Sequence, residues 1–228
     1  MSSKPIRLNK HLALSLGISR READEYIQRG RVHINGEIAQ LGNSVLPESE
    51  ITVDGKPLPG STKLEYVALH KPVGYVCSRK AQGDNPTIYS LLPASMSHLK
   101  PVGRLDKDSS GILLLTNDGD FAHRMTHPSF QKTKSYIVQL DKPLEPLHQQ
   151  MISDYGVEIG DGPSKLHLER TDDTRHEWRI TMHEGRNRQI RRTFLALGYT
   201  VTSLHRLTFG SYTLNNLTPG TYAATVKR

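Results

Sequence analysis

The sequence predicts an α+β protein built from two units, a small N-terminal unit over residues 1–60 and a larger unit over residues 65–228. Within the first sixty residues, apolar side chains first recur at helical spacing and then alternate at strand spacing, and a polar, turn-rich segment follows them. The rest of the chain intersperses short apolar runs with helical patterns, which is typical of a mixed α and β domain.

Two helices are predicted at the start of the N-terminal unit. Leu8, Leu12 and Leu16 fall on one helical face, and the glycine that follows them ends this helix. Ser19 begins a Ser-Arg-Arg-Glu capping box, which predicts the start of a second helix that Gly30 ends.

Short strands are predicted after these helices. The dipeptides Asn35-Gly36 and Asp54-Gly55 follow alternating apolar residues and favour tight hairpin turns. Segment 56–63 is polar and rich in turn-forming residues, so we predict that it links the two units.

The larger unit is predicted to contain both strands and helices. Strands are expected over residues 66–69, 112–116, 136–138, 178–182, 200–204 and 222–226, and helices over 120–126 and 188–197.

Composition narrows the functional classes. The 228 residues include 30 Lys and Arg against 23 Asp and Glu, a net charge of +7, with a pI near 9.5. This excess favours an anionic partner, nucleic acid first. No segment approaches the roughly 18 apolar residues of a membrane helix, and the single cysteine, Cys77, excludes an intrachain disulfide. We therefore expect a cytoplasmic monomer with no membrane partner.

Basic residues cluster in the N-terminal unit, where arginine can present its planar fork to phosphate oxygens. The candidates for RNA binding are Arg7, Lys10, Arg20, Arg21, Arg29 and Arg31. The charge by itself is also explained by a solvent-exposed helix face that binds no RNA. The segments RLNK, SRREA, RGRV and VHINGE, however, resemble the small RNA-binding module shared by a small-subunit ribosomal protein and tyrosyl-tRNA synthetase. The resemblance implies that this unit binds RNA.

The most informative loop of the larger unit carries Asp106 between glycines, immediately before a predicted buried strand. Asp106 and Asp108 resemble the opening of a calcium loop, but Asn117 stands where that loop needs a bidentate Glu. A magnesium-dependent aspartyl-phosphate enzyme would place its Asp at the end of an apolar strand, and Pro and Gly interrupt the residues before Asp106. An aspartate that merely caps a turn remains a further interpretation.

A family resemblance offers another interpretation. PVGRLDKDSSGILLLTNDGD resembles the catalytic loop of RsuA/RluB-type pseudouridine synthases of ribosomal RNA. LHKPVGYVCS, KSYIV and EGRNRQIRRTFLALGYTVTSLHR resemble further segments of that family in the same order. The resemblance implies a mixed, mostly antiparallel sheet flanked by helices, and isomerisation of a uridine in ribosomal RNA or in a ribosomal subunit precursor.

The resemblance also implies roles for individual residues. Asp106 would be the catalytic carboxylate, acting on the sugar either as a nucleophile at the anomeric carbon or as a base. Tyr136 would stack on the uracil and help to remove a proton, Arg191 would pair with Asp106, and Leu204 would pack on the base.

The remaining candidates are substrate ligands. Arg104 would contact the extruded nucleotide, and the residues expected to bind phosphates are Arg186, Arg188 and Arg192. We expect no cofactor and no metal, since His123 and His127 lack a third ligand. The motifs slightly favour large-subunit over small-subunit RNA as the target. The alternative is a non-catalytic RNA-binding factor in ribosome assembly.

Overall fold

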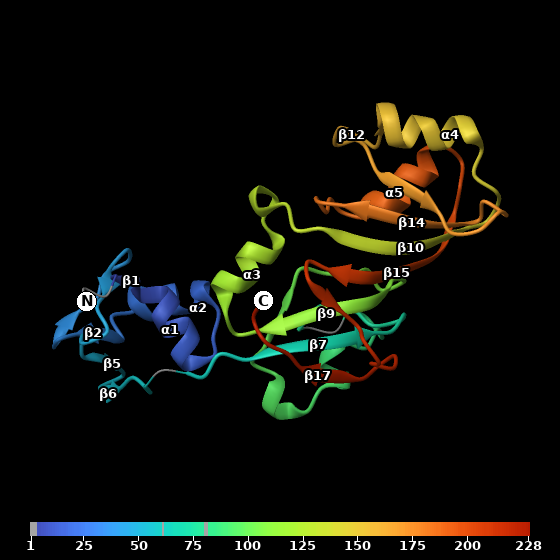
Figure 1. Cartoon of the computed structure of the whole chain (residues 1–228). Helices are drawn as coiled ribbons and strands as arrows, with labels where there is room; N and C mark the ends of the chain where they lie inside the picture. Colours follow the sequence, from blue (N-terminus) through green and yellow to red (C-terminus); the bar gives the residue numbers. More distant parts are fainter. Residues whose placement is uncertain (1–3, 61, 80–81) are drawn as a thin grey trace. The chain divides into compact units, whose positions relative to one another are not determined.

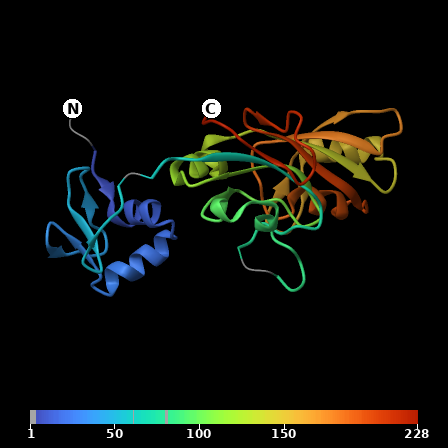
Figure 2. The same cartoon turned by 90° about the horizontal axis from the view of Figure 1, so that it is seen from below.

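The computed structural model describes residues 4–60, 62–79 and 82–228, and the chain divides into two compact units between Leu64 and Glu65. Figures 1 and 2 show the N-terminal unit in blue and the larger unit in green to red. Within the described residues, no helix is both long and apolar enough to cross a bilayer.

The N-terminal unit packs two helices against short strands. Its elements are β1 (Ile6–Arg7), α1 (Leu8–Leu16), α2 (Arg20–Gln28), β2 (Val32–Ile34), β3 (Glu37–Ile38), β4 (Ser44–Val45), β5 (Ile51–Val53) and β6 (Lys56–Pro57). Four of the strands form an antiparallel sheet in the order β3-β2-β5-β6, and β1 pairs with β4.

Local signals in the sequence set these elements. The side chain of Ser19 accepts a hydrogen bond from the backbone N–H of Glu22, and the carboxylate of Glu22 accepts one in return from the N–H of Ser19, which confirms the capping box. Asn35 and Gly36 both have positive φ, as the predicted tight hairpin turn requires. The predicted linker is too long, because Lys56–Pro57 pairs with β5 and the side chain of Leu58 packs on the core of this unit.

The larger unit is built around one long sheet. Its strands are β7 (Tyr66–Lys71), β8 (Lys100–Val102), β9 (Ser110–Thr116), β10 (Lys134–Leu140), β11 (Val157–Glu158), β12 (Pro163–Ser164), β13 (His167–Arg170), β14 (Glu177–Met182), β15 (Val201–Phe209), β16 (Tyr212–Thr213) and β17 (Tyr222–Ala224). Its helices are α3 (Gly119–Thr126), α4 (Pro146–Gln150) and α5 (Gln189–Ala196), with the 3₁₀ turns η1 (Ile88–Leu91), η2 (Ala94–Met96) and η3 (Pro128–Phe130) and the π-helical turn η4 (Met151–Tyr155).

The sheet is mixed and mostly antiparallel, as the sequence predicts. Its strands follow the order β13-β14-β10-β15-β9-β7-β17, with β8 paired to β9 and β16 paired to β15. Neighbours along this order run antiparallel except for β9 and β15, which run parallel and join the two halves of the sheet.

The junction between β9 and β15 depends on a glycine. Ser110 lies opposite His205, and Gly111 lies opposite Arg206. A Cβ atom on Gly111 would lie 2.2 Å from the backbone oxygen of Arg206, and the φ of Gly111 is +114°. Only a residue without a side chain allows the two backbones to approach this closely.

A bulge in β15 determines which side chains share a face near this junction. Tyr136 of β10 lies opposite Arg206, whereas Ser135 lies opposite Thr208, so Leu207 is an extra residue on β15. Without it, Arg206 and Phe209 would point to opposite faces of the sheet, because side chains alternate along a strand. With it, both side chains contribute to the same cavity.

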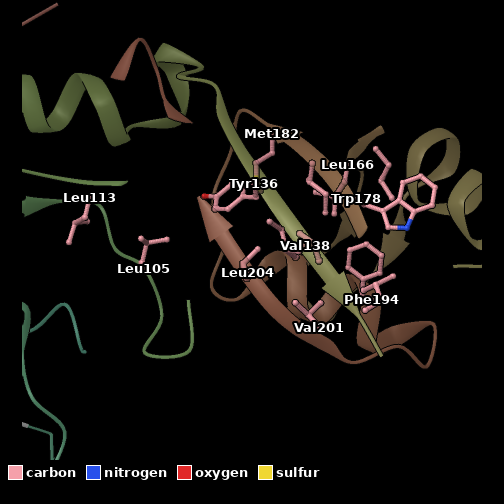
Figure 3. Close-up of a cluster of buried hydrophobic side chains, with 14 of the residues drawn as sticks. Leu105, Leu113, Tyr136, Val138, Leu166, Trp178, Met182, Phe194, Val201 and Leu204 are labelled. Carbon is pink, nitrogen blue, oxygen red and sulfur yellow. The ribbon is translucent and has the colours of Figure 1, made fainter. Parts of the chain in front are cut away.

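The main core lies where β10, β14 and β15 pack against α5. Trp178, Val138 and Phe194 are fully buried there, and Ile190 joins the same cluster (Figure 3). Ile190 and Phe194 lie one helical turn apart and form the buried face of the helix. This packing fixes α5, and with it the arginines of its first two turns, against the sheet.

Candidate active site

A cavity of about 210 Å³ opens where the loop before β9 meets the faces of β10 and β15. Six residues singled out in the sequence line it, namely Arg104, Asp106, Tyr136, Arg186, Arg188 and Leu204. They come from segments spread over about a hundred residues of chain, so the fold brings together side chains that the sequence predicted one motif at a time. Figure 3 shows Tyr136 and Leu204 on neighbouring strands, with the segment of Leu105 facing them.

Asp106 supplies a carboxylate to this cavity. Its side chain is 30% exposed, and its Oδ2 atom lies 3.5 Å from Nη1 of Arg188. Arg188 immediately precedes α5 and has a φ of +46°, a left-handed conformation that is uncommon for a residue with a side chain. The sequence predicted Arg188 as a phosphate ligand, whereas in the structure it makes the ion pair with Asp106.

Lys71 fastens the loop that carries Asp106. Its fully buried ammonium donates hydrogen bonds to backbone oxygens of Ser109 at 2.7 Å, Pro72 at 2.9 Å and Asp106 at 3.0 Å, with Lys107 at 3.5 Å. Burial lowers the pKa of Lys71 to about 8. Sequence analysis missed this residue, because it lies at the end of β7, directly after His70 and beyond the strand predicted over residues 66–69.

Arg191 also holds the loop by its backbone. It donates from Nη1 to the oxygen of Val201 at 2.8 Å and from Nη2 to the oxygen of Asp108 at 2.8 Å, with Oγ of Ser109 at 3.4 Å. Burial lowers the pKa of Arg191, and the charge of Arg188 lowers it further. The two Nη atoms of Arg191 thus bind carbonyl oxygens of the loop and of β15, and the pairing of Arg191 with Asp106 stays a prediction.

Tyr136 and Leu204 form an apolar wall of the cavity. Each side chain is 7% exposed, and Val138, two residues beyond Tyr136, lies opposite Leu204 in the antiparallel pairing. In Figure 3 the ring of Tyr136 extends from β10 toward the segment of Leu105. This places an aromatic ring and an aliphatic side chain beside the carboxylate of Asp106 in one cavity.

Arg186 and Arg192 are bound to the hairpin formed by β11 and β12. Arg186 donates to backbone oxygens of that hairpin, including Pro163 at 2.8 Å, and Arg192 donates to the oxygen of Ile159 at 2.8 Å and to the carboxylate of Asp161 at 2.9 Å. The hydrogen bond from Arg192 lowers the pKa of Asp161. Protein acceptors bind both guanidinium groups, although the buried Nε of Arg186 has no partner among the described residues, and the role of both arginines as phosphate ligands stays a prediction.

Three other cations line the cavity. Arg104 is exposed at its edge, as expected for a residue that meets the substrate backbone. Lys134 and Arg206 are buried in its wall, and sequence analysis did not select them. The strands predicted over residues 136–138 and 200–204 stop short of both residues, which side-chain alternation along β10 and β15 places on the face of Tyr136 and Leu204.

The cations of the N-terminal unit differ in how firmly they are held. Arg7, Arg20 and Arg29 are exposed and contact the oxygen of Gly42, the side chain of Asn9 and the carboxylate of Glu25, respectively. Arg31 instead makes two hydrogen bonds to Asp54 and stacks 3.9 Å from the ring centre of Tyr26. The bond from Arg31 lowers the pKa of Asp54. Arg31 thus joins α2 to the second hairpin, a structural contact that its prediction as an RNA ligand did not include.

In the described part of the chain, no group of three or more His, Cys, Asp or Glu side chains is placed to hold a metal ion. His123 and His127 stack on each other, with ring centres 4.8 Å apart. The thiol of Cys77 lies on the main core, and burial raises its pKa.

Comparison with protein families matches both units. Residues 65–196 match the family described as RNA pseudouridylate synthase, and residues 6–51 match the S4 domain. The first match contains Asp106, Tyr136 and Arg191.

Individual proteins are similar over nearly the whole chain. The ribosomal small subunit pseudouridine synthase A of Pasteurella multocida is 37% identical over 222 residues, covering 95% of this chain and 94% of that protein. The protein of the same name from Escherichia coli is 37% identical over 223 residues, covering 95% of each. A solved crystal structure of a pseudouridylate synthase is 34% identical, with a TM-score of 0.69 over 97% of this chain and 96% of that one.

Proposed function

This chain belongs to the RNA pseudouridylate synthase family and carries an S4 domain, and from that premise we propose that it isomerises a uridine of small-subunit ribosomal RNA to pseudouridine. The curated relatives named above are small-subunit enzymes, so the preference for large-subunit RNA drawn from the sequence is not supported. The observation that carries the proposal is the cavity in which the Asp106 carboxylate meets the ring of Tyr136.

Asp106 is the group that starts the reaction in this proposal. Its carboxylate either attacks the anomeric carbon of the target ribose or removes a proton from the sugar, and in both routes the bond between that carbon and uracil N1 breaks. The base then turns and rejoins through C5, losing one proton there and gaining one at N1. The ion pair with Arg188 places positive charge at the carboxylate before the substrate arrives.

Tyr136 and Leu204 would hold the base while it turns. A ring stacked on uracil and an aliphatic side chain beside it allow rotation in the plane of the base without releasing it. The hydroxyl of Tyr136 is a candidate acceptor for the proton lost from C5, as the family resemblance implies. Arg104, exposed at the edge of the cavity, would contact the phosphate of the extruded nucleotide.

Lys71 and Arg191 act in this proposal as positioning residues. Together they bind the four backbone oxygens of segment 106–109 and tie them to Pro72 and Val201, which fixes the direction in which Asp106 presents its carboxylate. A displacement of about 1 Å at a reacting group can reduce a rate roughly a hundredfold. The S4 domain would supply RNA affinity through its exposed cations, and it contains no candidate catalytic residue.

The test compares Asp106→Asn with the matched variant Asp108→Asn in the same loop. The assay measures release of tritium from [5-³H]uridine in small-subunit and in large-subunit ribosomal RNA, since isomerisation removes the hydrogen from C5. The wild-type enzyme should release tritium from small-subunit RNA, Asp106→Asn should release none while binding that RNA within a few-fold, and Asp108→Asn should retain activity within about tenfold.

Two outcomes would contradict the proposal. Turnover by Asp106→Asn would remove the catalytic role of this carboxylate. Binding of ribosomal RNA without any tritium release by the wild-type enzyme would favour a non-catalytic assembly factor instead.

A further inference from the structure

Two buried cations stand side by side in the wall of the cavity, and the proposed mechanism does not yet use them. Lys134 is 9% exposed and Arg206 is 2% exposed, and both line the cavity. Lys134 precedes Tyr136 by two residues on β10, which puts both side chains on one face of the sheet, roughly 7 Å apart along the strand. Arg206 lies opposite Tyr136 on β15.

Protein atoms satisfy these two cations incompletely. Arg206 donates from Nε to the backbone oxygen of Ile112 at 2.8 Å, but its buried Nη2 atom has no hydrogen-bond partner among the described residues. Within the described part of the chain, the ammonium of Lys134 donates to two neutral carbonyl oxygens, that of Glu184 at 3.3 Å and that of Lys132 at 3.5 Å.

No carboxylate offsets their charge inside the cavity. Among the described residues that line it, Asp106 carries the single carboxylate, and this group pairs with Arg188. Both cations contact the ring of Phe209, whose centre lies 5.4 Å from the ammonium of Lys134 and 4.9 Å from the guanidinium of Arg206. Burial lowers the pKa of Lys134 and repulsion by Arg206 lowers it further, while the charge of Glu184, which does not line the cavity, opposes them without cancelling the shift.

Such an arrangement is costly in the empty enzyme and favourable once an anion binds. Buried like charges destabilise a fold unless a partner of opposite sign completes them. Preorganised positive charge in a buried site stabilises the negative charge that develops during a reaction. The reaction of this family creates such an anion, because breaking the bond to N1 leaves its electron pair on uracil, delocalised onto O2 and O4.

We propose that Lys134 and Arg206 form an anion site for the departing uracil, with Lys134 donating to a carbonyl oxygen of the base and Arg206 adding its charge. The bond from the anomeric carbon to N1 breaks, the pair moves to the base, and the two cations stabilise the base until C5 bonds to the same carbon. N1 then gains a proton and C5 loses one, so the isomerisation needs no further reactant.

The position of the pair favours the base over a phosphate as its ligand. Phosphates remain attached to the RNA chain and approach from outside, where the exposed Arg104 lines the edge of the cavity. Lys134 and Arg206 are instead buried on the sheet face beside Tyr136, the residue assigned to stack on the base. This inference rests on the proposed isomerisation and on Tyr136 as the stacking residue.

The test uses the full-length enzyme with whichever ribosomal RNA the wild type modifies, so a wrong assignment of the ribosomal subunit does not affect it. Lys134→Met removes the charge, Lys134→Gln keeps a donor without charge, and Lys142→Met, at an exposed lysine beyond the far end of β10, is the matched control. Each is first shown to be folded by circular dichroism and thermal unfolding. If Lys134→Met does not fold, the rates of Lys134→Gln alone test the role of the charge.

Single-turnover rates are measured with uridine and with 5-fluorouridine at the target position. Fluorine withdraws electrons and stabilises the base anion, so bond breaking then depends less on the enzyme's cations. We expect Lys134→Met to lower the rate on uridine by roughly a hundredfold with RNA affinity changed only a few-fold. On 5-fluorouridine, followed as loss of the intact nucleoside, the defect should be at least tenfold smaller, and Lys142→Met should match the wild type on both.

A merely structural role would give a different pattern. Equal defects on uridine and 5-fluorouridine would overturn the anion site, because a displaced strand slows both substrates alike. A defect confined to RNA affinity would overturn it in favour of a phosphate contact. Absence of wild-type turnover on every ribosomal RNA would refute the proposed function, and the anion site with it.

Discussion

The two units of this protein use positive charge in opposite ways. In the N-terminal unit, Arg20, Arg21 and Arg29 lie on the surface of α2 and its ends, where solvent surrounds them. In the larger unit, Lys71 and Arg206 are almost completely buried, and Lys71 is saturated with backbone oxygens. Surface cations are suited to an RNA backbone whose phosphates arrive from solvent, whereas buried cations fix a loop or await a charge that forms inside the site.

This difference shows that the number of basic residues does not measure RNA binding. Arg186 and Arg192 belong to the basic segment that most resembles a phosphate ligand set, yet the β11–β12 hairpin occupies them. Lys71 and Lys134 lie on strands and contribute to the site by different routes. The predictions below test this contrast between the two units, beginning with the largest expected effect.

The junction between β9 and β15 in the larger unit should not tolerate a side-chain carbon at Gly111. Gly111→Ala would place a methyl group 2.2 Å from the oxygen of Arg206, so we expect loss of soluble, folded protein. The matched change in the N-terminal unit is Gly55→Ala, where φ is +74° and nothing lies within 4 Å of the added carbon. That variant should lose only about 1–2 kcal/mol of stability from its left-handed backbone. Soluble yield and thermal unfolding of both variants check this.

Comparable stability of the two glycine variants would show that β9 and β15 can separate without loss of the fold. That result would contradict the requirement for a glycine at this junction.

Removing the buried ammonium should disable the loop. Lys71→Met leaves the backbone oxygens of Ser109 and Asp106 without their donor, so we expect roughly a hundredfold lower kcat with RNA affinity changed only a few-fold. Steady-state kinetics with tritium release measures both quantities. An unchanged kcat would mean that the loop holds its shape without Lys71.

The same variant should change how stability depends on pH. The pKa of Lys71 is about 8 in the folded protein, below its ordinary value of 10.5, so between these pH values the unfolded chain binds more protons than the folded one. The penalty of burying the charge is complete below pH 8 and disappears as the pH rises toward 10.5. Wild-type stability should therefore rise relative to Lys71→Met across this window, by on the order of 3 kcal/mol.

Denaturant unfolding of both proteins at several pH values provides the measurement. A difference in unfolding free energy that stays constant from pH 7 to 10.5 would contradict a lowered pKa of Lys71.

Deleting residues 1–60 should weaken RNA binding without changing the chemistry. We expect lower affinity for structured ribosomal RNA and a shallower salt dependence, because each lost phosphate contact lowers the slope of log K against log salt by roughly 0.7 to 0.9. The rate at saturating RNA should stay within a few-fold, since Asp106, Tyr136 and Arg191 all belong to the larger unit. Circular dichroism first establishes that the truncated protein is folded. A large loss of the saturated rate would assign the N-terminal unit to the active site.

The smallest expected effect is a difference in the salt dependence of RNA binding between two arginine variants of the N-terminal unit. Arg21 is exposed on α2, so Arg21→Met should lower the salt slope by about one phosphate contact. Arg31 is engaged by Asp54 and Tyr26, so Arg31→Met should leave the slope unchanged and lower the thermal stability of the unit. Affinity measured from 50 to 200 mM salt distinguishes them, and equal slopes for the two variants would remove the distinction between surface and structural cations.

Sequence analysis was most successful where a local pattern determines the structure. The capping box at Ser19 and the Asn35-Gly36 turn involve residues a few positions apart, and their conformations follow from local hydrogen bonds and φ angles. The mixed, mostly antiparallel character of the sheet and the family followed from resemblance over long segments. Elements without a periodic pattern, such as β8 and α4, were not predicted, because two to five residues are too few to show a period.

The partners of side chains were the least predictable part. Arg188 and Arg191 are three residues apart, and the sequence gives no measure of which one reaches Asp106 and which one reaches the backbone of the loop. The bulge at Leu207 decides that Phe209 joins Arg206 at the cavity, and it depends on pairing between strands about seventy residues apart. Such choices depend on packing in three dimensions rather than on residue type.

The parallel pairing of β9 with β15 has a consequence for how the enzyme is made. Ser110 and His205 are 95 residues apart in the chain, and their side chains meet at this junction. A closing segment of this length makes the junction one of the costlier and slower contacts to form. During synthesis, Lys71 and Asp106 emerge long before Arg206, so a nascent chain holds its carboxylate without a cavity around it. Catalytic competence is therefore acquired only after β15 has left the ribosome and closes the sheet.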